Sequence, residues 1–222
     1  MSENIKQDIS NLDLNYTYIS LMSKKLKVGI IGGGRAAVIK AKSFVDKGCY
    51  VEVISKSFNE NLINIQDKNL KLVYGDYKKE FIKDKHIIVI AINDDKLIER
   101  IEKHCNDETK IYVNATNFKK GIAIIPVQRE SKSLNIAMST KMGNPKGSLL
   151  VAKEALNILK RYDDFIEYSS KIRNNAKKIE EYKKDIIDFV CTEDFKYIYN
   201  KKKDKLVLKM FFDGELVKEL YK

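Results

Sequence analysis

Residues 28–37 are Val28-Gly29-Ile30-Ile31-Gly32-Gly33-Gly34-Arg35-Ala36-Ala37, an apolar run that passes directly into glycines and then into a helical pattern. This order is typical of a dinucleotide site. Gly32 permits the tight turn, and Gly34 lets the backbone approach a diphosphate without an intervening Cβ. Ala37 stands where the third glycine of such motifs packs helix on strand. The diphosphate is expected on the exposed N–H groups of the following helix.

A strand-turn-helix without a ligand can carry the same letters, so the neighbouring sequence matters. Residues 35–47 place apolar side chains on one helical face, Gly48 ends the pattern, and residues 50–54 form the next predicted strand. Further strands are predicted at 70–74, 86–92 and 111–114, with a helix over 95–104. This alternation predicts an α/β fold, a Rossmann-type, mostly parallel sheet that binds ligands at the carboxyl ends of its strands.

The second strand of such folds normally ends in an acidic residue that binds the ribose hydroxyls of adenosine. Here Ile54 is followed by Ser55-Lys56-Ser57. Lys56 and the serines are suited either to a ribose or to a 2′-phosphate, and an ordinary solvated turn has the same composition. NAD is the expected cofactor, and NADP is not excluded.

The remaining segments divide the chain further. We expect a flexible extension over 1–16, the NAD-binding Rossmann domain over 17–117, a small α+β segment over 118–147, to which the family resemblance given below assigns dimerisation and substrate binding, and a mainly helical C-terminal domain over 148–222. Residues 18–21 are a candidate edge strand. Residues 122–126 and 134–138 predict two antiparallel strands, followed by a polar loop and a helix near 148–161. Residues 163–190 have helical character, and Leu206–Phe212 fits either a further helix or a strand that enters a turn.

Positive charge is concentrated in the middle of the chain. The net charge is +11, and residues 110–150 hold seven Lys and Arg against one Glu. A cleft lined by such charge captures anionic small molecules faster. The alternatives are a nucleic-acid surface, for which no recognisable fold is present, and a basic surface that aids solubility.

Several classes of protein are disfavoured by the composition. No apolar run reaches the length of about 18 residues needed to span a membrane, and the polar N-terminal residues are unlike a secretory signal. The cysteines, Cys49, Cys105 and Cys191, are too far apart for a metal-binding or disulfide framework. We therefore expect a cytoplasmic protein without a metal site.

The order of five motifs resembles the precorrin-2 dehydrogenase family, which includes the N-terminal half of siroheme synthase and stand-alone relatives. The motifs are Gly32-Gly33-Gly34-x-x-Ala37-x-x-Lys40, Ala91-x-Asn93-Asp94-Asp95, Val113-Asn114, Ile125-Pro126 and Ala137-Met138-Ser139-Thr140-x-x-Gly143-x-Pro145. The resemblance covers residues 17–161. It implies NAD-dependent oxidation of precorrin-2 to sirohydrochlorin in siroheme or cobalamin biosynthesis, by a homodimeric enzyme. The tetrapyrrole carries eight carboxylates, which gives the basic segment a purpose.

The resemblance also implies site residues. The dinucleotide is expected at Gly32, Gly34, Arg35, Ala36, Lys56, Ser57 and Asn93, and the substrate at Asn114, Ser139, Thr140 and Lys141. Asn117 stands where bifunctional members carry a catalytic Asp, and an amide cannot act as a carboxylate base. This favours a stand-alone dehydrogenase with little or no ferrochelatase activity. The alternatives are a bifunctional enzyme and a non-catalytic relative that binds a tetrapyrrole or dinucleotide.

Overall fold

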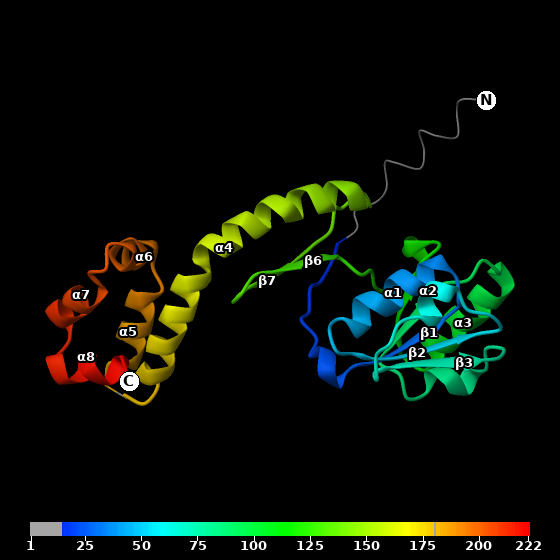
Figure 1. Cartoon of the computed structure of the whole chain (residues 1–222), viewed down its shortest axis with the longest axis horizontal. Coiled ribbons are helices and arrows are strands. Elements are labelled where there is room, and N and C mark those ends of the chain that lie inside the picture. Colours follow the sequence, from blue (N-terminus) through cyan, green and yellow to red (C-terminus); the bar gives the residue numbers. More distant parts are fainter. Residues whose placement is uncertain (1–14, 180) are drawn as a thin grey trace, which may run out of the picture. The chain divides into compact units, whose positions relative to one another are not determined.

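The computed structural model describes residues 15–179 and 181–222. It contains two compact units, each described here by itself. Residues 16–125 form the first, which we call the sheet unit, and residues 126–222 lie in the second, the helical unit (Figure 1). The division at Ile125 falls inside the segment 118–147 that the sequence predicts. Of the predicted extension 1–16, all but the last two residues lie outside the described part of the chain.

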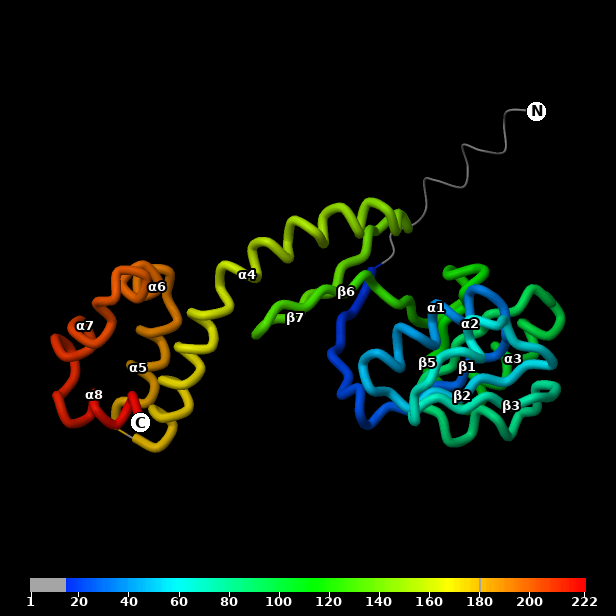
Figure 2. The backbone as a smooth tube through the Cα atoms, in the orientation of Figure 1, coloured from blue at the N-terminus to red at the C-terminus, as the bar shows by residue number. Residues whose placement is uncertain are grey.

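The sheet unit is built on five parallel strands, which confirms the predicted Rossmann-type sheet. Figure 2 follows the backbone through this sheet, whose strand order is β3-β2-β1-β4-β5. The strands are β1 (Lys27–Ile31), β2 (Tyr50–Ser55), β3 (Leu70–Tyr74), β4 (Ile87–Ile90) and β5 (Ile111–Asn114). Because β1 lies between β2 and β4, its carboxyl end is the point where the strand order reverses, and open α/β sheets bind ligands there.

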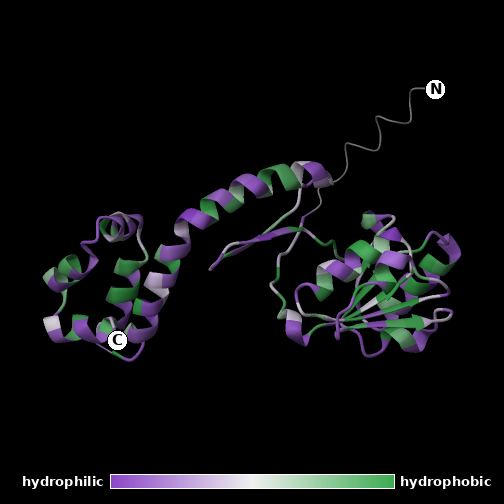
Figure 3. Ribbon diagram, viewed as in Figure 1, coloured by the Kyte–Doolittle hydropathy of each residue, from purple (hydrophilic) through white to green (hydrophobic). Residues whose placement is uncertain are grey.

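Helices cover both faces of this sheet. They are α1 (Arg35–Val45), α2 (Glu60–Ile63) and α3 (Asp95–Asp107), with 3-10 turns at Ser23–Lys25, Lys79–Ile82 and Phe118–Lys120. Side chains alternate between two clusters along each strand: Val28 and Ile30 pack with α1, and Ile31 packs with α3. The sheet is accordingly hydrophobic in Figure 3. Burial on both faces explains why the central strands are continuous apolar runs.

The helical unit begins with a two-stranded antiparallel sheet and continues as helices. Its elements are β6 (Val127–Glu130), β7 (Asn135–Met138), α4 (Pro145–Ala176), α5 (Lys183–Val190), α6 (Glu193–Asn200), α7 (Asp204–Phe211) and α8 (Gly214–Leu220). Its core includes Ile172, Ile186, Phe195, Leu208 and Leu220, all at most 2% exposed. No helix in the described ranges is both long and apolar enough to cross a bilayer.

Two local predictions are wrong, and one that the sequence leaves open between helix and strand is decided by the structure. Residues 18–21 form no strand. The first strand of the small sheet is Val127–Glu130 rather than 122–126, because Pro126 cannot donate to a ladder and the alternating pattern begins only after it. Leu206–Phe212 is helical up to Phe211, because burial of Leu208 against neighbouring helices prevails over the local preference of its apolar run. In addition, the helix expected near 148–161 extends over residues 145–176.

Candidate functional site

The three glycines after β1 differ in what surrounds them. Gly32 has a φ of +118°, and a Cβ built on it would lie 2.2 Å from the carbonyl oxygen of Ala91. A Cβ on Gly33 would lie 2.0 Å from the carbonyl oxygen of Ser57. A Cβ on Gly34 would have no atom within 4 Å. The first two glycines are therefore required by the fold, whereas the space beside Gly34 is open to a ligand.

Helix α1 begins at this open space. Gly34 is its N-cap and makes no side-chain capping bond, and the first turn carries no acidic residue. The first N–H groups of a helix have no partner within the helix, and they favour an anion. Arg35 and Ala36 are exposed in this turn, whereas Ala37 is fully buried against the strands. The residues present thus fit a dinucleotide diphosphate at this position.

The loop after β2 lies directly against the glycine turn. The Asn59 amide donates to the carbonyl oxygen of Gly33 at 2.8 Å, and Ser57 limits the space at Gly33. Lys56 and Ser57 are exposed, and the Lys56 ammonium lies 2.9 Å from the carboxylate of Asp76, which follows β3. The sequence motifs do not indicate Gly33 or Asp76 as residues that shape this site. Asp76 lies two residues after β3, and only the pairing of β3 with β2 brings it beside Lys56.

Two predicted asparagines follow β4 and end β5. Asn93 is exposed beyond β4, just before Asp94 caps α3 by accepting from the Leu97 amide at 3.0 Å. Asn114 is only 1% exposed, and its Nδ2 donates to Glu102 at 2.8 Å. Its Oδ1 accepts from Thr116 and from the Asn117 amide. The predicted contact between Asn114 and substrate would require these bonds to rearrange.

Comparison with known proteins shows what this chain is similar to. Residues 19–127 match a family model described as "Putative NAD(P)-binding". A precorrin-2 dehydrogenase from Priestia megaterium is 24% identical over 66% of this chain and 71% of its own length. A protein from Methanocaldococcus jannaschii named "Putative precorrin-2 dehydrogenase" is 29% identical over 61% of this chain and 68% of its own. The solved structure titled "SirC, precorrin-2 dehydrogenase" shares the fold, with a TM-score of 0.66 at 19% identity over 88% of this chain and all of that one.

The chain is thus similar in sequence to precorrin-2 dehydrogenases and shares the fold of one. The structure shows the surroundings of Asn117, which stands where bifunctional precorrin-2 dehydrogenases are expected to carry an Asp. Asn117 is exposed and caps the 3-10 turn Phe118–Lys120, where its Oδ1 accepts from the Lys119 amide at 3.2 Å. The position follows β5 at the carboxyl edge of the sheet, the same edge as Gly34 and Asn93. It offers an amide there and no carboxylate.

The substrate loop predicted for the family lies in the helical unit, between β7 and α4. The Thr140 hydroxyl accepts from the Asn144 amide, and Asn144 caps α4 by accepting from the Gly147 amide at 2.9 Å. Lys141 is exposed. The Ser139 hydroxyl is buried and has no hydrogen-bond partner within residues 15–179 and 181–222. A buried polar atom of this kind is available to a bound ligand.

The basic segment 110–150 is not uniformly available to an anion. Lys110 donates to the carbonyl oxygens of Lys83 and Lys85 at 2.7 and 2.9 Å and so belongs to the fold. Lys132 pairs with Glu167 at 2.5 Å. The exposed cations that make no ion pair within the described ranges are Lys119, Lys120, Lys141 and Lys146, and Arg129 is half-buried. Fewer basic side chains are therefore available to an anion than the count of charges in the sequence suggests.

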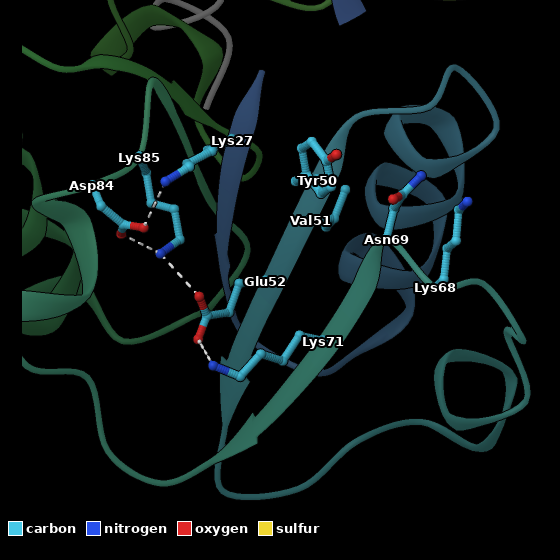
Figure 4. A pocket seen from close by; sticks show the side chains of 9 residues that line it. All are labelled: Lys27, Tyr50, Val51, Glu52, Lys68, Asn69, Lys71, Asp84 and Lys85. Carbon is cyan, nitrogen blue, oxygen red and sulfur yellow. Dashed lines mark hydrogen bonds and ion pairs between the residues drawn. The ribbon is translucent and has the colours of Figure 1, made fainter. Parts of the chain in front are cut away.

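A pocket of about 290 Å³ lies at the opposite, amino-terminal edge of the sheet (Figure 4). The Lys85 side chain, 6% exposed, lies between Asp84 at 2.5 Å and Glu52 at 2.9 Å, and Lys71 also contacts Glu52 at 3.0 Å. Because its buried ammonium is already paired on both sides, this network stabilises the strand ends rather than forming a second ligand site.

These contacts shift the pKa of each partner. Burial favours a higher pKa for Glu52, but the hydrogen bonds from Lys85 and Lys71 outweigh it and leave this pKa below its usual value. The hydrogen bond from Lys85 holds the pKa of Asp84 below its usual value. Burial favours a lower pKa for Lys85, but the bonds to Asp84 and Glu52 reverse the effect and raise it. All three groups are therefore charged near neutral pH.

Both histidines make hydrogen bonds within the fold. His86 Nδ1 accepts from the Lys27 amide at 3.0 Å, and His104 Nδ1 lies 3.0 Å from the hydroxyl of Tyr77. Burial raises the pKa of Tyr77 to about 12, so this hydroxyl stays protonated at neutral pH. Within the described residues, no group of three or more His, Cys, Asp or Glu side chains is placed to hold a metal ion.

Proposed function

We propose that this protein is an NAD-dependent oxidoreductase that converts precorrin-2 to sirohydrochlorin. The observation that carries the proposal is the open space beside Gly34 at the uncapped start of α1, in a chain whose relatives are named precorrin-2 dehydrogenases. The reaction removes two electrons and two protons from the macrocycle. One hydride goes to the nicotinamide, and one proton goes to a base.

The sheet unit supplies the dinucleotide site in this proposal. The N–H groups of Arg35 and Ala36 bind the diphosphate, and Gly34 provides the clearance. Lys56 and Ser57 lie at the adenosine end, and Asn93 lies at the nicotinamide end. A dinucleotide held there would supply the hydride acceptor, and the residues around it would hold the substrate carbon in line and exclude water.

The substrate is a polycarboxylate, and the exposed cations suit it. Ser139, Thr140 and Lys141 bind its carboxylates, assisted by cations of the basic segment. The unpartnered hydroxyl of Ser139 supports this assignment. Asn114 contributes through the loop that its hydrogen bonds hold in place.

The proton acceptor is not Asn117, because a neutral amide has no basic lone pair for this step. Another group or a substrate carboxylate takes the proton, and the enzyme acts chiefly by positioning. Ferrochelatase activity should be low for the same reason, since the carboxylate used by bifunctional members is absent. The protein in this proposal is a dehydrogenase that releases metal-free sirohydrochlorin.

We further propose that the chain is a homodimer. The small sheet has only two strands, so β6 and β7 each leave an edge without a strand partner in the described chain. Nearby along the sequence, α4 exposes Leu149, Leu150 and Val151 to the extent of 44, 69 and 51%. Unpaired strand edges and exposed apolar side chains favour association with a second copy.

The test is an anaerobic incubation of the full chain with precorrin-2 and each dinucleotide, followed by ferrous iron. We expect sirohydrochlorin with NAD, and little siroheme after iron is added. Rapid siroheme formation would select the bifunctional alternative. Binding of either ligand without any product would select a non-catalytic relative and overturn the proposal.

A further inference from the structure

The acid that Rossmann folds place at the end of the second strand is missing from Ser55-Lys56-Ser57. We propose that Asp76, from the loop after β3, supplies this carboxylate, binds the ribose hydroxyls of the adenosine half, and selects NAD over NADP. The inference rests on the proposed dinucleotide site and adds the residue that determines its specificity.

Strand pairing brings Asp76 to the required edge. In the register of β2 with β3, Ser55 is opposite Tyr74, so the two strands end side by side. The Gly75 amide then donates to the carbonyl oxygen of Ser55 at 3.0 Å. Asp76 is the next residue, and its carboxylate lies 2.9 Å from the Lys56 ammonium. A residue from β3 thereby reaches the position that the end of β2 normally supplies.

The same loop also touches the glycine turn. Ser57 is the residue that leaves no room for a Cβ at Gly33, and the ring of Phe58 packs edge-on against Tyr74 at 4.7 Å between centroids. The loop after β2 is thus held between the turn that precedes α1 and the end of β3. The ribose that follows the diphosphate extends from that turn toward this loop.

Charge decides which ribose fits. A ribose with free hydroxyls donates hydrogen bonds to a carboxylate, whereas a 2′-phosphate brings about two negative charges toward it. Lys56 alone would favour the phosphate. The Lys56–Asp76 ion pair is weak, because its side chains are 76 and 72% exposed. Pairing with Asp76 alone therefore does not stop Lys56 from attracting a 2′-phosphate. Selection therefore comes from repulsion by Asp76.

The experiment measures dissociation constants of NADH and NADPH for the full chain by fluorescence titration, without tetrapyrrole. We expect the unmodified protein to bind NADH about tenfold more tightly than NADPH, and Asp76→Asn to reverse or abolish this ratio by tightening NADPH and weakening NADH. Adding Lys56→Ala to Asp76→Asn should weaken NADPH again. Asp46→Asn removes the same charge at the far end of α1 and should leave both constants unchanged.

The possible outcomes distinguish a failure of the inference on Asp76 from a failure of the proposed function. An unchanged NADH-to-NADPH ratio in Asp76→Asn, with a folded circular dichroism spectrum, would overturn the inference and leave the proposed function standing. A preference for NADPH in the unmodified protein would do the same. Failure of the unmodified protein to bind either dinucleotide would instead overturn the proposed function, and the inference with it.

Discussion

At the scale of single residues, the three consecutive glycines at 32–34 have different roles. The fold requires Gly32 and Gly33, whereas the space beside Gly34 is open to a ligand. Gly34 has open space around it and a φ of −83°, which any residue can adopt. We expect Gly34→Val to fold normally and to lose at least about tenfold in dinucleotide affinity, because the new side chain fills the approach to the first N–H groups of α1. Thermal unfolding and NADH titration measure the two effects.

Gly33→Ala is the matched control for this change. Its Cβ would meet the carbonyl oxygen of Ser57 at 2.0 Å, so the backbone must shift and the midpoint of unfolding should fall. Equal NADH affinity in Gly34→Val and the unmodified protein would show that the diphosphate does not bind at this turn.

Lys85 provides a second residue-scale prediction, on stability. Lys85→Ala removes the hydrogen bonds of a buried ammonium to Glu52 and Asp84 and should lower the free energy of unfolding by about 2 kcal/mol. Lys71→Ala is the control, because its side chain is 71% exposed and such pairs contribute about 0–1 kcal/mol. Denaturant unfolding measures both, and equal losses would contradict the assignment.

The cost of Lys85→Ala should depend on pH. Carboxyl pKa values that folding lowers stabilise the protein above their unfolded values, and this contribution disappears as the pH falls through the folded ones. The raised pKa of Lys85 stabilises the protein below its unfolded value and ceases to do so as the pH rises through the folded one. The difference between the two proteins should therefore be greatest between about pH 5 and pH 10. A constant difference at acid pH would contradict this.

At the scale of elements, one buried carboxylate joins the β6–β7 turn to α4. Asp163 is 7% exposed and accepts from the Ser131 hydroxyl at 2.7 Å and from the Ser133 amide at 2.9 Å. We expect Asp163→Ala to lower the midpoint of thermal unfolding by several degrees, because the turn loses its acceptor. Asp164→Ala, one residue along at an exposed position, should have little effect. Similar midpoints for both variants would show that this contact does not anchor the small sheet.

The sequence predicted some elements better than others, for physical reasons. The strand at 87–90 is predictable because burial on both faces produces an unbroken apolar run, and those at 50–54 and 111–114 because short runs of β-branched and aromatic residues are typical of strands. Helix α7 cannot be told from a strand by its sequence, because its apolar run suits both, and only the packing of Leu208 inside the helical unit decides between them. Such tertiary contacts leave no periodic signal within an eight-residue segment.

The candidate site was predictable where it depends on local backbone. The glycine turn and the start of α1 follow from the order of residues 28–37. Asp76 could not be predicted, because its place beside Lys56 depends on the pairing of β3 with β2. The internal hydrogen bonds of Lys110 and Asn114 could not be predicted either, because a sequence shows a charge or an amide without its partners.

At the scale of the whole molecule, the proposed homodimer makes a direct prediction. Leu150 is 69% exposed on α4, and Leu150→Glu should shift the protein from dimer to monomer because a charge would be buried at the interface. Lys160→Glu, at another exposed position of α4, should leave the dimer intact. Sedimentation equilibrium measures the mass of each. A monomeric unmodified protein would contradict the proposal.

The central claim is that the turn at Gly34 holds the dinucleotide that oxidises precorrin-2. Its most direct test records NADH and sirohydrochlorin together in an anaerobic reaction of the unmodified protein and of Gly34→Val. The account predicts one NADH for each sirohydrochlorin in the unmodified protein, and neither product above background in the folded variant. Sirohydrochlorin formed without NADH, or formed equally by both proteins, would contradict it.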